Sequence, residues 1–229
     1  MDLGIQLNQL PFYPTISKCR ARTIRNGRAN DFSLTFCIKA MAEESPRPPI
    51  SARELIGSGV VRSIQPKEAA KAMSDENFVL LDIRPEWERE KACVSGSLTV
   101  PLFVGDPDNS PITLLKKWIH LGYIGLWTGQ RFTMFNPDFL PQVEAALPDK
   151  ETKVLVACGE GLRSMMAVSR LHTGGYKNLG WLAGGFNRST DKDFPSVDGP
   201  EKLQYATIGG VSFYFLQLLL FIQGTNKLD

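Results

Sequence analysis

Short apolar runs alternate with helix-forming segments along most of this chain. Residues 78–82 and 154–157 are largely apolar and of strand length, which is typical of strands buried on both faces. Residues 66–73 begin with proline, and good helix formers follow. The alternation predicts an α/β fold, with a central, mostly parallel sheet covered by helices on both faces. Further elements are expected as strands at 60–64, 98–100 and 179–183 and helices at 137–147 and 163–173.

The end of the chain follows another pattern, with no charged residue between Lys202 and Lys227. Its inner part, residues 208–222, is strongly apolar. A helix needs about 20 apolar residues to span a membrane, and a helix that is apolar all round has no polar face for solvent. We therefore predict a transmembrane helix over residues 203–224. The alternative is a hydrophobic helix that packs on the domain or on a partner protein.

An aromatic insert, residues 101–137, interrupts the α/β alternation. Aromatic clusters are usually buried, so we expect this insert to form a helix and a loop that pack on the domain. The alternative is a lid or a membrane-facing surface close to residues 158–164. The aromatic residues of the insert include Trp118, Tyr123, Trp127, Phe132 and Phe135.

The first 41 residues are basic, with six Lys or Arg and two Asp. This composition, with scattered Ser and Thr and no periodic apolar face, is typical of an organelle transit peptide. We expect cleavage near residues 40–42; the alternative is a disordered basic tail that stays on the protein. A polar, Pro-rich linker is expected over residues 42–58. The net charge of the whole chain is only +2, and we expect no nucleic-acid partner.

The cysteine content argues against a disulfide framework. Cys19 and Cys37 lie in the basic head, so the rest of the chain holds only Cys93 and Cys158. There is no C-x-x-C motif and no cluster of Cys and His. We therefore expect no metal site and no cofactor.

Cys158 is the candidate nucleophile. A glycine-rich loop follows it, and a helix is expected to open near Arg163, so that backbone N–H groups and a helix N-terminus face the sulfur. Both favour the thiolate. The alternative is a buried, inert thiol. Tyrosine phosphatases of the C-x5-R type need a wider loop for phosphate, and here Ser164 stands where their arginine would be, so sulfur fits better than phosphate.

Four segments, in the right order, resemble the rhodanese-like domain family. Residues 158–164 resemble C-x-x-G-x-R-[ST], and residues 80–88 resemble D-[VI]-R-x-x-x-E. Residues 94–101 are similar to the segment I-x-G-A-x-x-[IV]-P, and residues 182–186 to a late L-x-G-G element. The resemblance implies a rhodanese-like domain over residues 59–195. The basic head, the insert and the apolar C-terminal stretch are similar to membrane-associated chloroplast members from plants.

This resemblance implies a central parallel sheet flanked by helices and a sulfurtransferase activity. Family members with an intact cysteine move sulfane sulfur from a donor such as thiosulfate or 3-mercaptopyruvate to a thiolate or to cyanide. Cys158 would carry the sulfur as a persulfide, and the loop amides would stabilise the outer sulfur. Asp82 and Glu86 are expected to hold the scaffold, and Arg84 to line the pocket. The implied substrate and loop residues are Gly159, Glu160, Gly161, Leu162, Arg163, Ser164 and Arg84.

Three departures from the family pattern bear on this expectation. Cys93 stands where the family often has His, and we expect it to be buried as a small apolar side chain. Glu160 lies in the loop where many members carry a neutral or basic residue. A carboxylate there opposes both the Cys158 thiolate and an anionic donor, so we expect slow turnover of thiosulfate. After Phe186, the chain lacks the Trp-bearing helix with which the family commonly continues.

The sequence therefore predicts a single-domain sulfurtransferase with a Cys158 persulfide, tethered to a thylakoid or envelope membrane of the chloroplast through residues 203–224. Its expected partners are a small sulfur donor and a thiol acceptor, protein thiols included. The alternative is a non-catalytic docking module at the membrane, in which the aromatic insert binds a partner protein.

Overall fold

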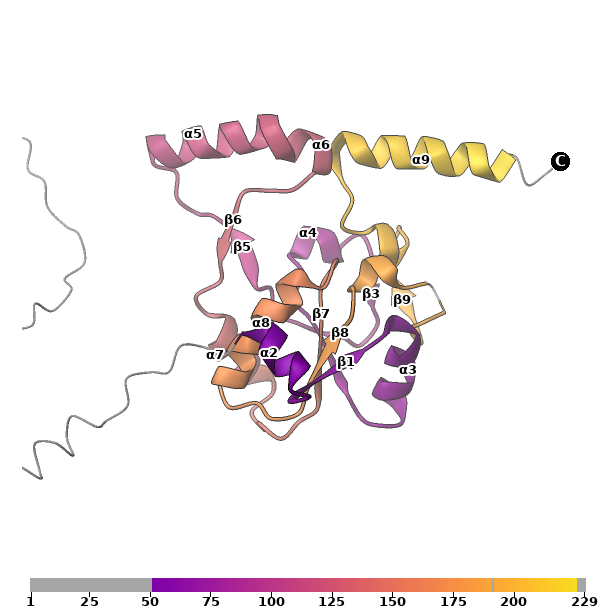
Figure 1. Cartoon of the computed structure of the whole chain (residues 1–229). Coiled ribbons are helices and arrows are strands. Elements are labelled where there is room, and N and C mark those ends of the chain that lie inside the picture. The colour runs from indigo at the N-terminus through magenta and orange to yellow at the C-terminus, as the bar shows by residue number, and fades with distance from the viewer. Residues whose placement is uncertain (1–50, 191, 226–229) are drawn as a thin grey trace, which may run out of the picture. The chain divides into compact units, whose positions relative to one another are not determined.

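The computed structural model describes residues 51–190 and 192–225 (Figure 1). The predicted transit peptide lies outside these residues, as does most of the predicted linker. The linker prediction is wrong over residues 51–57, because Ala52–Gly57 form helix α2, which Ser51 caps at its N-terminus. Leu55 of this helix is buried in the core. The apolar face of α2 therefore makes it part of the domain.

A five-stranded parallel sheet forms the centre of the domain, as predicted. Its strands lie in the order β1-β8-β7-β2-β4, and each neighbouring pair is parallel. β2 and β7 pair up to Asp82 and Ala157, so both strands end at the same edge of the sheet. The strands are β1 (Val61–Ile64), β2 (Val79–Asp82), β4 (Leu98–Thr99), β7 (Val154–Ala157) and β8 (Leu179–Leu182).

Helices cover both faces of the sheet because its strands are apolar on both sides. Leu81 packs on one face with residues of α2, α7 and α8, and its neighbour Leu80 packs on the other face with residues of α3. Phe186 and Leu203, from two short 3₁₀ helices, complete the second cluster. The helices around the sheet are α3 (Pro66–Ser74), α4 (Glu86–Arg89), α7 (Phe139–Ala146), α8 (Leu162–Thr173), η2 (Phe186–Arg188) and η3 (Leu203–Tyr205).

The insert consists of an antiparallel ribbon and a helical arm. Phe103 and Phe135 of the ribbon pack edge to face and contact the core. Trp118 and Tyr123 of the arm, in contrast, are 75% and 83% exposed. The prediction that the insert packs on the domain is therefore wrong for its helical arm, which Figure 1 shows apart from the sheet. The elements are β5 (Phe103–Gly105), α5 (Pro111–His120), the π-helix η1 (Leu121–Gly125), α6 (Leu126–Thr128) and β6 (Thr133–Phe135).

A second antiparallel ribbon pairs β3 (Cys93–Val94) with β9 (Val197–Asp198). The thiol of Cys93 is free and its side chain is only half-buried. The expected burial of this cysteine is therefore met in part.

The C-terminal apolar stretch divides into two parts. Leu203 and Ala206 are buried in the second core cluster, so this part of the stretch belongs to the domain. Helix α9 begins at the next glycine pair and comprises the 16 residues Gly210–Thr225. None of the helices within residues 51–190 and 192–225 combines the length and the apolar character that crossing a membrane requires. The transmembrane helix predicted over residues 203–224 is therefore not confirmed, and the first residues of this range pack in the core.

Candidate active site at Cys158

The cysteine loop joins the end of β7 to the start of α8, as predicted. Gly161 precedes the helix with φ +93°, in the left-handed region that favours glycine. A Cβ atom at this position would lie 3.2 Å from the Gly184 nitrogen and from the ring of Trp181. Trp181 also donates its Nε1 proton to the Gly161 carbonyl at 2.9 Å. The loop turns toward the cysteine because only glycine permits this conformation at such close packing.

Backbone amides converge on the sulfur of Cys158. The N–H groups of Gly161 and Ser164 lie 3.1 Å and 3.3 Å from Sγ. Both belong to the first turn of α8 or its cap, so the positive end of the helix dipole points at the sulfur. Although the cysteine side chain is 0% exposed, it lines a pocket. The amides favour a negative charge on this sulfur.

The hydroxyl of Ser164 connects the thiol to the loop. It donates to the Gly161 carbonyl at 2.8 Å and accepts from the Cys158 thiol at 3.4 Å. A hydroxyl has one proton to donate, so in this arrangement its oxygen faces the protonated thiol. The two amides are therefore the donors that are already in place when the thiol ionises.

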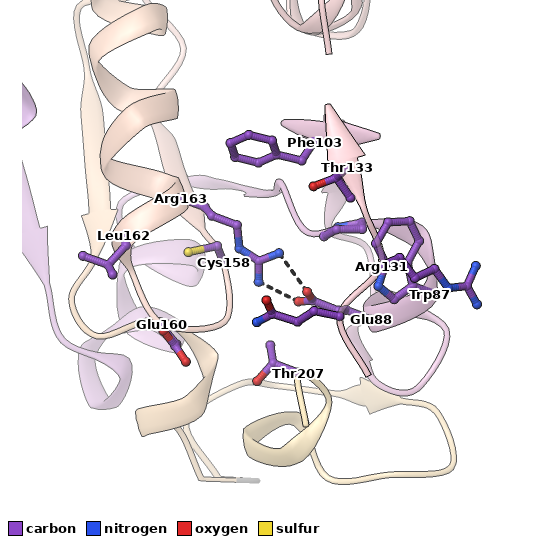
Figure 2. A pocket seen from close by; sticks show the side chains of 12 residues that line it. Trp87, Glu88, Phe103, Arg131, Thr133, Cys158, Glu160, Leu162, Arg163 and Thr207 are labelled. Carbon is purple, nitrogen blue, oxygen red and sulfur yellow. Dashed lines mark hydrogen bonds and ion pairs between the residues drawn. The ribbon is translucent and has the colours of Figure 1, made fainter. Parts of the chain in front are cut away.

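A bidentate ion pair closes the loop. The guanidinium of Arg163 donates to both carboxylate oxygens of Glu88, at 2.8 Å and 2.7 Å, and Figure 2 shows it between that carboxylate and Cys158. Burial lowers the pKa of Arg163, but the hydrogen bonds and charge of Glu88, together with the charge of Cys158, outweigh burial and raise it. Arg163 therefore stays cationic beside the sulfur.

The acid in this ion pair is not the one that the sequence analysis chose. Glu86 is exposed on α4, whereas Glu88 on the same helix faces Arg163. The motif D-[VI]-R-x-x-x-E places its acid four residues after Arg84, which is position 88. Spacing within the motif was thus the signal that could have identified the correct residue.

Arg84 lies in the core and not in the pocket, so its predicted placement is wrong. Its guanidinium donates to the carboxylate of Asp82 and, at 2.8 Å, to the Ala92 carbonyl. It also lies 4.4 Å from the centre of the Phe186 ring. The side chain is held by Asp82 because the chain turns tightly there, with the Arg84 N–H also bonded to that carboxylate. Asp82 holds the scaffold, as expected.

The late glycine pair supports the loop from behind. The carbonyls of Cys158 and Gly159 accept from the N–H groups of Phe186 and Asn187, at 2.9 Å and 2.8 Å. Gly185 has φ +65°, and a Cβ atom there would overlap both of those carbonyl oxygens. The segment after β8 thus fixes the back of the cysteine loop.

The pocket in front of the sulfur has a volume of about 290 Å³, and its walls come from distant parts of the chain (Figure 2). Of the predicted site residues, four line it, and Gly159, Gly161 and Ser164 build the loop beneath. The insert supplies one wall, as in the alternative that placed it close to residues 158–164, although no residue of this wall was named from the sequence. The C-terminal segment supplies a wall that sequence reasoning missed, because only folding brings it to the cysteine. The lining residues are Pro85, Trp87, Glu88, Phe103, Gln130, Arg131, Thr133, Cys158, Glu160, Leu162, Arg163 and Thr207.

Thr207 shows how closely the C-terminal segment approaches the loop. Its hydroxyl donates to the side chain of Asn187 at 2.8 Å. Its methyl group lies so near Gly159 that a Cβ atom at position 159 would overlap it. The glycine of the loop is therefore required by a residue almost fifty positions later in the sequence.

Comparison with known proteins identifies the family of this domain. The model of the family described as "Rhodanese-like domain" matches residues 65–192, which is more than half of the chain. The chain belongs to the rhodanese-like domain family. Its cysteine loop, its ion pair and its late glycine pair all fall within the matched residues.

Relatives within the family come from Arabidopsis thaliana. Rhodanese-like domain-containing protein 10 is 66% identical over 173 residues, which cover 76% of this chain and 81% of the relative. "Rhodanese-like domain-containing protein 11, chloroplastic" is 40% identical over 69% of this chain and 53% of the relative. "Rhodanese-like domain-containing protein 9, chloroplastic" is 32% identical over 71% of this chain and 68% of the relative. Two of these three relatives are thus named as chloroplast proteins.

Proposed function

We propose that this rhodanese-like protein is a sulfurtransferase that carries sulfane sulfur as a persulfide on Cys158. The observation that carries the proposal is the convergence of the Gly161 and Ser164 amides on Sγ, at the floor of a pocket. These donors are fixed before reaction, so they stabilise negative charge on sulfur without rearranging. The pocket gives a small donor access to an otherwise buried side chain.

The reaction has two steps. The Cys158 thiolate attacks the outer sulfur of the donor, so the Sγ–S bond forms while the bond from that sulfur to the rest of the donor breaks. The leaving group departs with the electron pair, as sulfite when the donor is thiosulfate. An acceptor thiolate then attacks the same sulfur, breaks the Sγ–S bond and leaves as a persulfide, which restores the Cys158 thiolate. No external oxidant or reductant is required.

The charges around the pocket bear on the choice of donor. The charge of Arg163 is matched by Glu88, and Arg131 and Glu160 add one charge of each sign to the pocket lining. Of these two, Glu160 belongs to the cysteine loop itself, two residues from the sulfur carrier. Like charges repel, so the dianion thiosulfate is disfavoured relative to a donor of lower charge such as 3-mercaptopyruvate. We therefore expect 3-mercaptopyruvate to load Cys158 faster.

The proposed location of this reaction is the chloroplast. Two observations support it: relatives in Arabidopsis thaliana are named as chloroplastic, and the first 41 residues have the composition of a transit peptide. A fluorescent fusion of the full chain should enter chloroplasts, and the same fusion without residues 1–41 should remain outside. Equal import of the two fusions would contradict the role of the head.

Intact-mass spectrometry of the full chain tests the sulfur chemistry. After exposure to 3-mercaptopyruvate or thiosulfate, the wild type should gain one sulfur atom that cyanide removes. Cys158→Ser should show no gain, and Cys93→Ser, the matched control at the other cysteine of the described residues, should gain as the wild type does. Absence of a gain with both donors would overturn the proposal in favour of the non-catalytic docking module.

A further inference from the structure

Two segments far apart in sequence form one exposed apolar surface, which we call the helical surface (residues 111–128 and 210–223). Figure 1 shows α5, α6 and α9 in a row along one side of the domain. Seven of its side chains are at least 62% exposed: Ile112, Leu115, Trp118, Ile119, Tyr123, Tyr214 and Phe221. Soluble proteins rarely expose so many large apolar side chains together, and patches of this kind mark interaction sites.

A joint of three glycines holds the two parts of the helical surface together. Gly129 and Gly210 have φ +72° and +58°. A Cβ atom on Gly129 would lie 2.6 Å from the Cα atom of Gly209, and one on Gly210 would overlap the Leu126 carbonyl. The end of α6 and the start of α9 therefore touch backbone to backbone. Contact this close makes α6 and the first turn of α9 a single unit.

The charges within the helical surface are positive, although Asp108 lies beside Lys117 at the start of α5 and Glu90 lies near the glycine joint. The insert has no acidic residue between Asp108 and Asp138, although it contains Lys116, Lys117 and Arg131. At the glycine joint, Lys91 donates to the Ile208 carbonyl at 2.5 Å. An apolar surface flanked by cations complements a layer that is apolar inside and anionic at its edge.

The pattern of exposure favours a lipid layer over a protein groove. On α9, Tyr214 and Phe215 are both exposed, as are Leu218 and Leu219. Neighbouring helix positions point about 100° apart, so the exposed apolar surface is wider than the stripe that a groove covers. Hydrocarbon chains cover such a surface without a matching shape. Because α9 contains no charged residue, contact with lipid would bury no charge of this helix.

The length and composition of the helices favour a position in the plane of the membrane. The 16 residues of α9 are about 24 Å long, shorter than the hydrocarbon core of about 30 Å. On α5, Ile112, Leu115 and Ile119 repeat with the period of a helix and are each at least 62% exposed. Trp118 and Tyr123 combine apolar rings with a polar atom, which suits the boundary between lipid and water.

We propose that the helical surface binds in the plane of a membrane leaflet that contains anionic lipid. The inference goes beyond sulfur transfer, because none of the residues that carry it belongs to the cysteine loop. It also links the membrane to the active site: Gln130 and Arg131, directly after the glycine joint, and Thr207, just before it, line the pocket. A bound leaflet would thus adjoin the pocket walls.

Vesicle flotation of the full chain tests this proposal. We expect the protein to float with vesicles of phosphatidylcholine and phosphatidylglycerol and to bind vesicles of phosphatidylcholine alone more weakly. Replacing two exposed aromatics, Trp118→Ser with Phe221→Ser, should weaken partitioning roughly hundredfold, because each side chain loses its transfer to lipid. The matched control Val60→Ser, an exposed apolar side chain outside the helical surface, should bind as the wild type does.

Depth measurements separate an in-plane helix from a spanning one. Lipids brominated near the headgroup should quench tryptophan fluorescence more than lipids brominated near the bilayer centre. The double variant Trp118→Phe with Trp127→Phe should still bind but lose most of this quenching, because Trp118 and Trp127 are the exposed tryptophans of the helical surface.

Four outcomes would overturn the proposal. These are no flotation with anionic vesicles by a folded, monodisperse chain, equal binding to neutral vesicles, and strongest quenching from the bilayer centre. The fourth is a dimer that the Trp118→Ser, Phe221→Ser variant dissociates while vesicles remain unbound, which would assign the surface to a second copy of the chain. Flotation of Cys158→Ser should match the wild type. Flotation therefore tests membrane binding alone, whereas intact mass tests sulfur transfer.

Discussion

The central sheet and the helical surface are both strongly apolar in sequence, yet they differ completely in burial. All four residues of β7 are 0% exposed, whereas Tyr214 and Phe221 of α9 are 74% and 70% exposed. The difference arises because α2, α7 and α8 cover one face of the sheet and α3 the other, while α9 meets α6 at a glycine joint. Apolar composition thus does not by itself show whether the domain covers a segment.

Matched leucine truncations should test this contrast most strongly. Leu81→Ala, in the sheet, should lower the free energy of unfolding by about 2–5 kcal/mol, because it leaves a cavity in a closed core. Leu115→Ala, on α5, should change it by less than about 0.5 kcal/mol. Denaturant unfolding of the full chain, followed by circular dichroism, measures both. A comparable loss for Leu115→Ala would show that the domain itself covers the helical surface.

Two glycine variants test whether the buried segment after β8 holds the cysteine loop in position. Gly185→Ala and Gly175→Ala both place a side chain at positive φ, which costs about 1–2 kcal/mol. At Gly175 a Cβ atom meets nothing within 4 Å, whereas at Gly185 it overlaps the Cys158 and Gly159 carbonyls. Gly185→Ala should therefore be the less stable variant, and its persulfide loading should fall about a hundredfold because the loop shifts.

The control for this prediction is the loading of Gly175→Ala. Its rate, followed by intact mass, should match the wild type even though its stability is lower. Equal loss of loading in both variants would mean that global stability, and not the position of the loop, limits the reaction.

Substitutions of two glutamates on α4 compare a side chain that faces the candidate active site with one that faces solvent. Glu88→Gln should lower the free energy of unfolding by about 1–2 kcal/mol, since it removes the carboxylate that Arg163 binds with two hydrogen bonds. Glu86→Gln, at an exposed position on the same helix, should leave it within about 0.5 kcal/mol of the wild type. Thermal and denaturant unfolding compare the two variants. The reverse order would restore the scaffold role first assigned to Glu86.

The smallest expected effect concerns the donor. Glu160→Gln should raise the rate of thiosulfate loading about fivefold, because it removes a like charge from an exposed position at the pocket. The gain should shrink at high salt, where exposed charges are screened. Glu54→Gln, an exposed acid outside the pocket, serves as the control. A salt-independent gain would point to altered loop shape instead of charge.

Local sequence motifs predicted which residues form the cysteine loop. Cys158, Gly161 and Ser164 were all predicted from a short segment, because strand, tight turn and helix N-terminus follow one another directly in the chain. Arg84 shows the limit: its motif position was read correctly, but its side chain turned to Asp82 and the Phe186 ring. The direction of a long side chain depends on neighbours that the motif does not contain.

The sequence alone determined the parallel α/β core and the cysteine loop, since strand-length apolar runs and a glycine-rich turn before a helix are local features of the chain. Only the tertiary structure decided the pocket walls and the boundaries of the apolar tail. Thr207 reaches Gly159, and the glycine joint brings α6 to α9, through contacts between segments many residues apart. Such contacts depend on how the whole chain packs, because no local pattern of residues records the distance between distant segments.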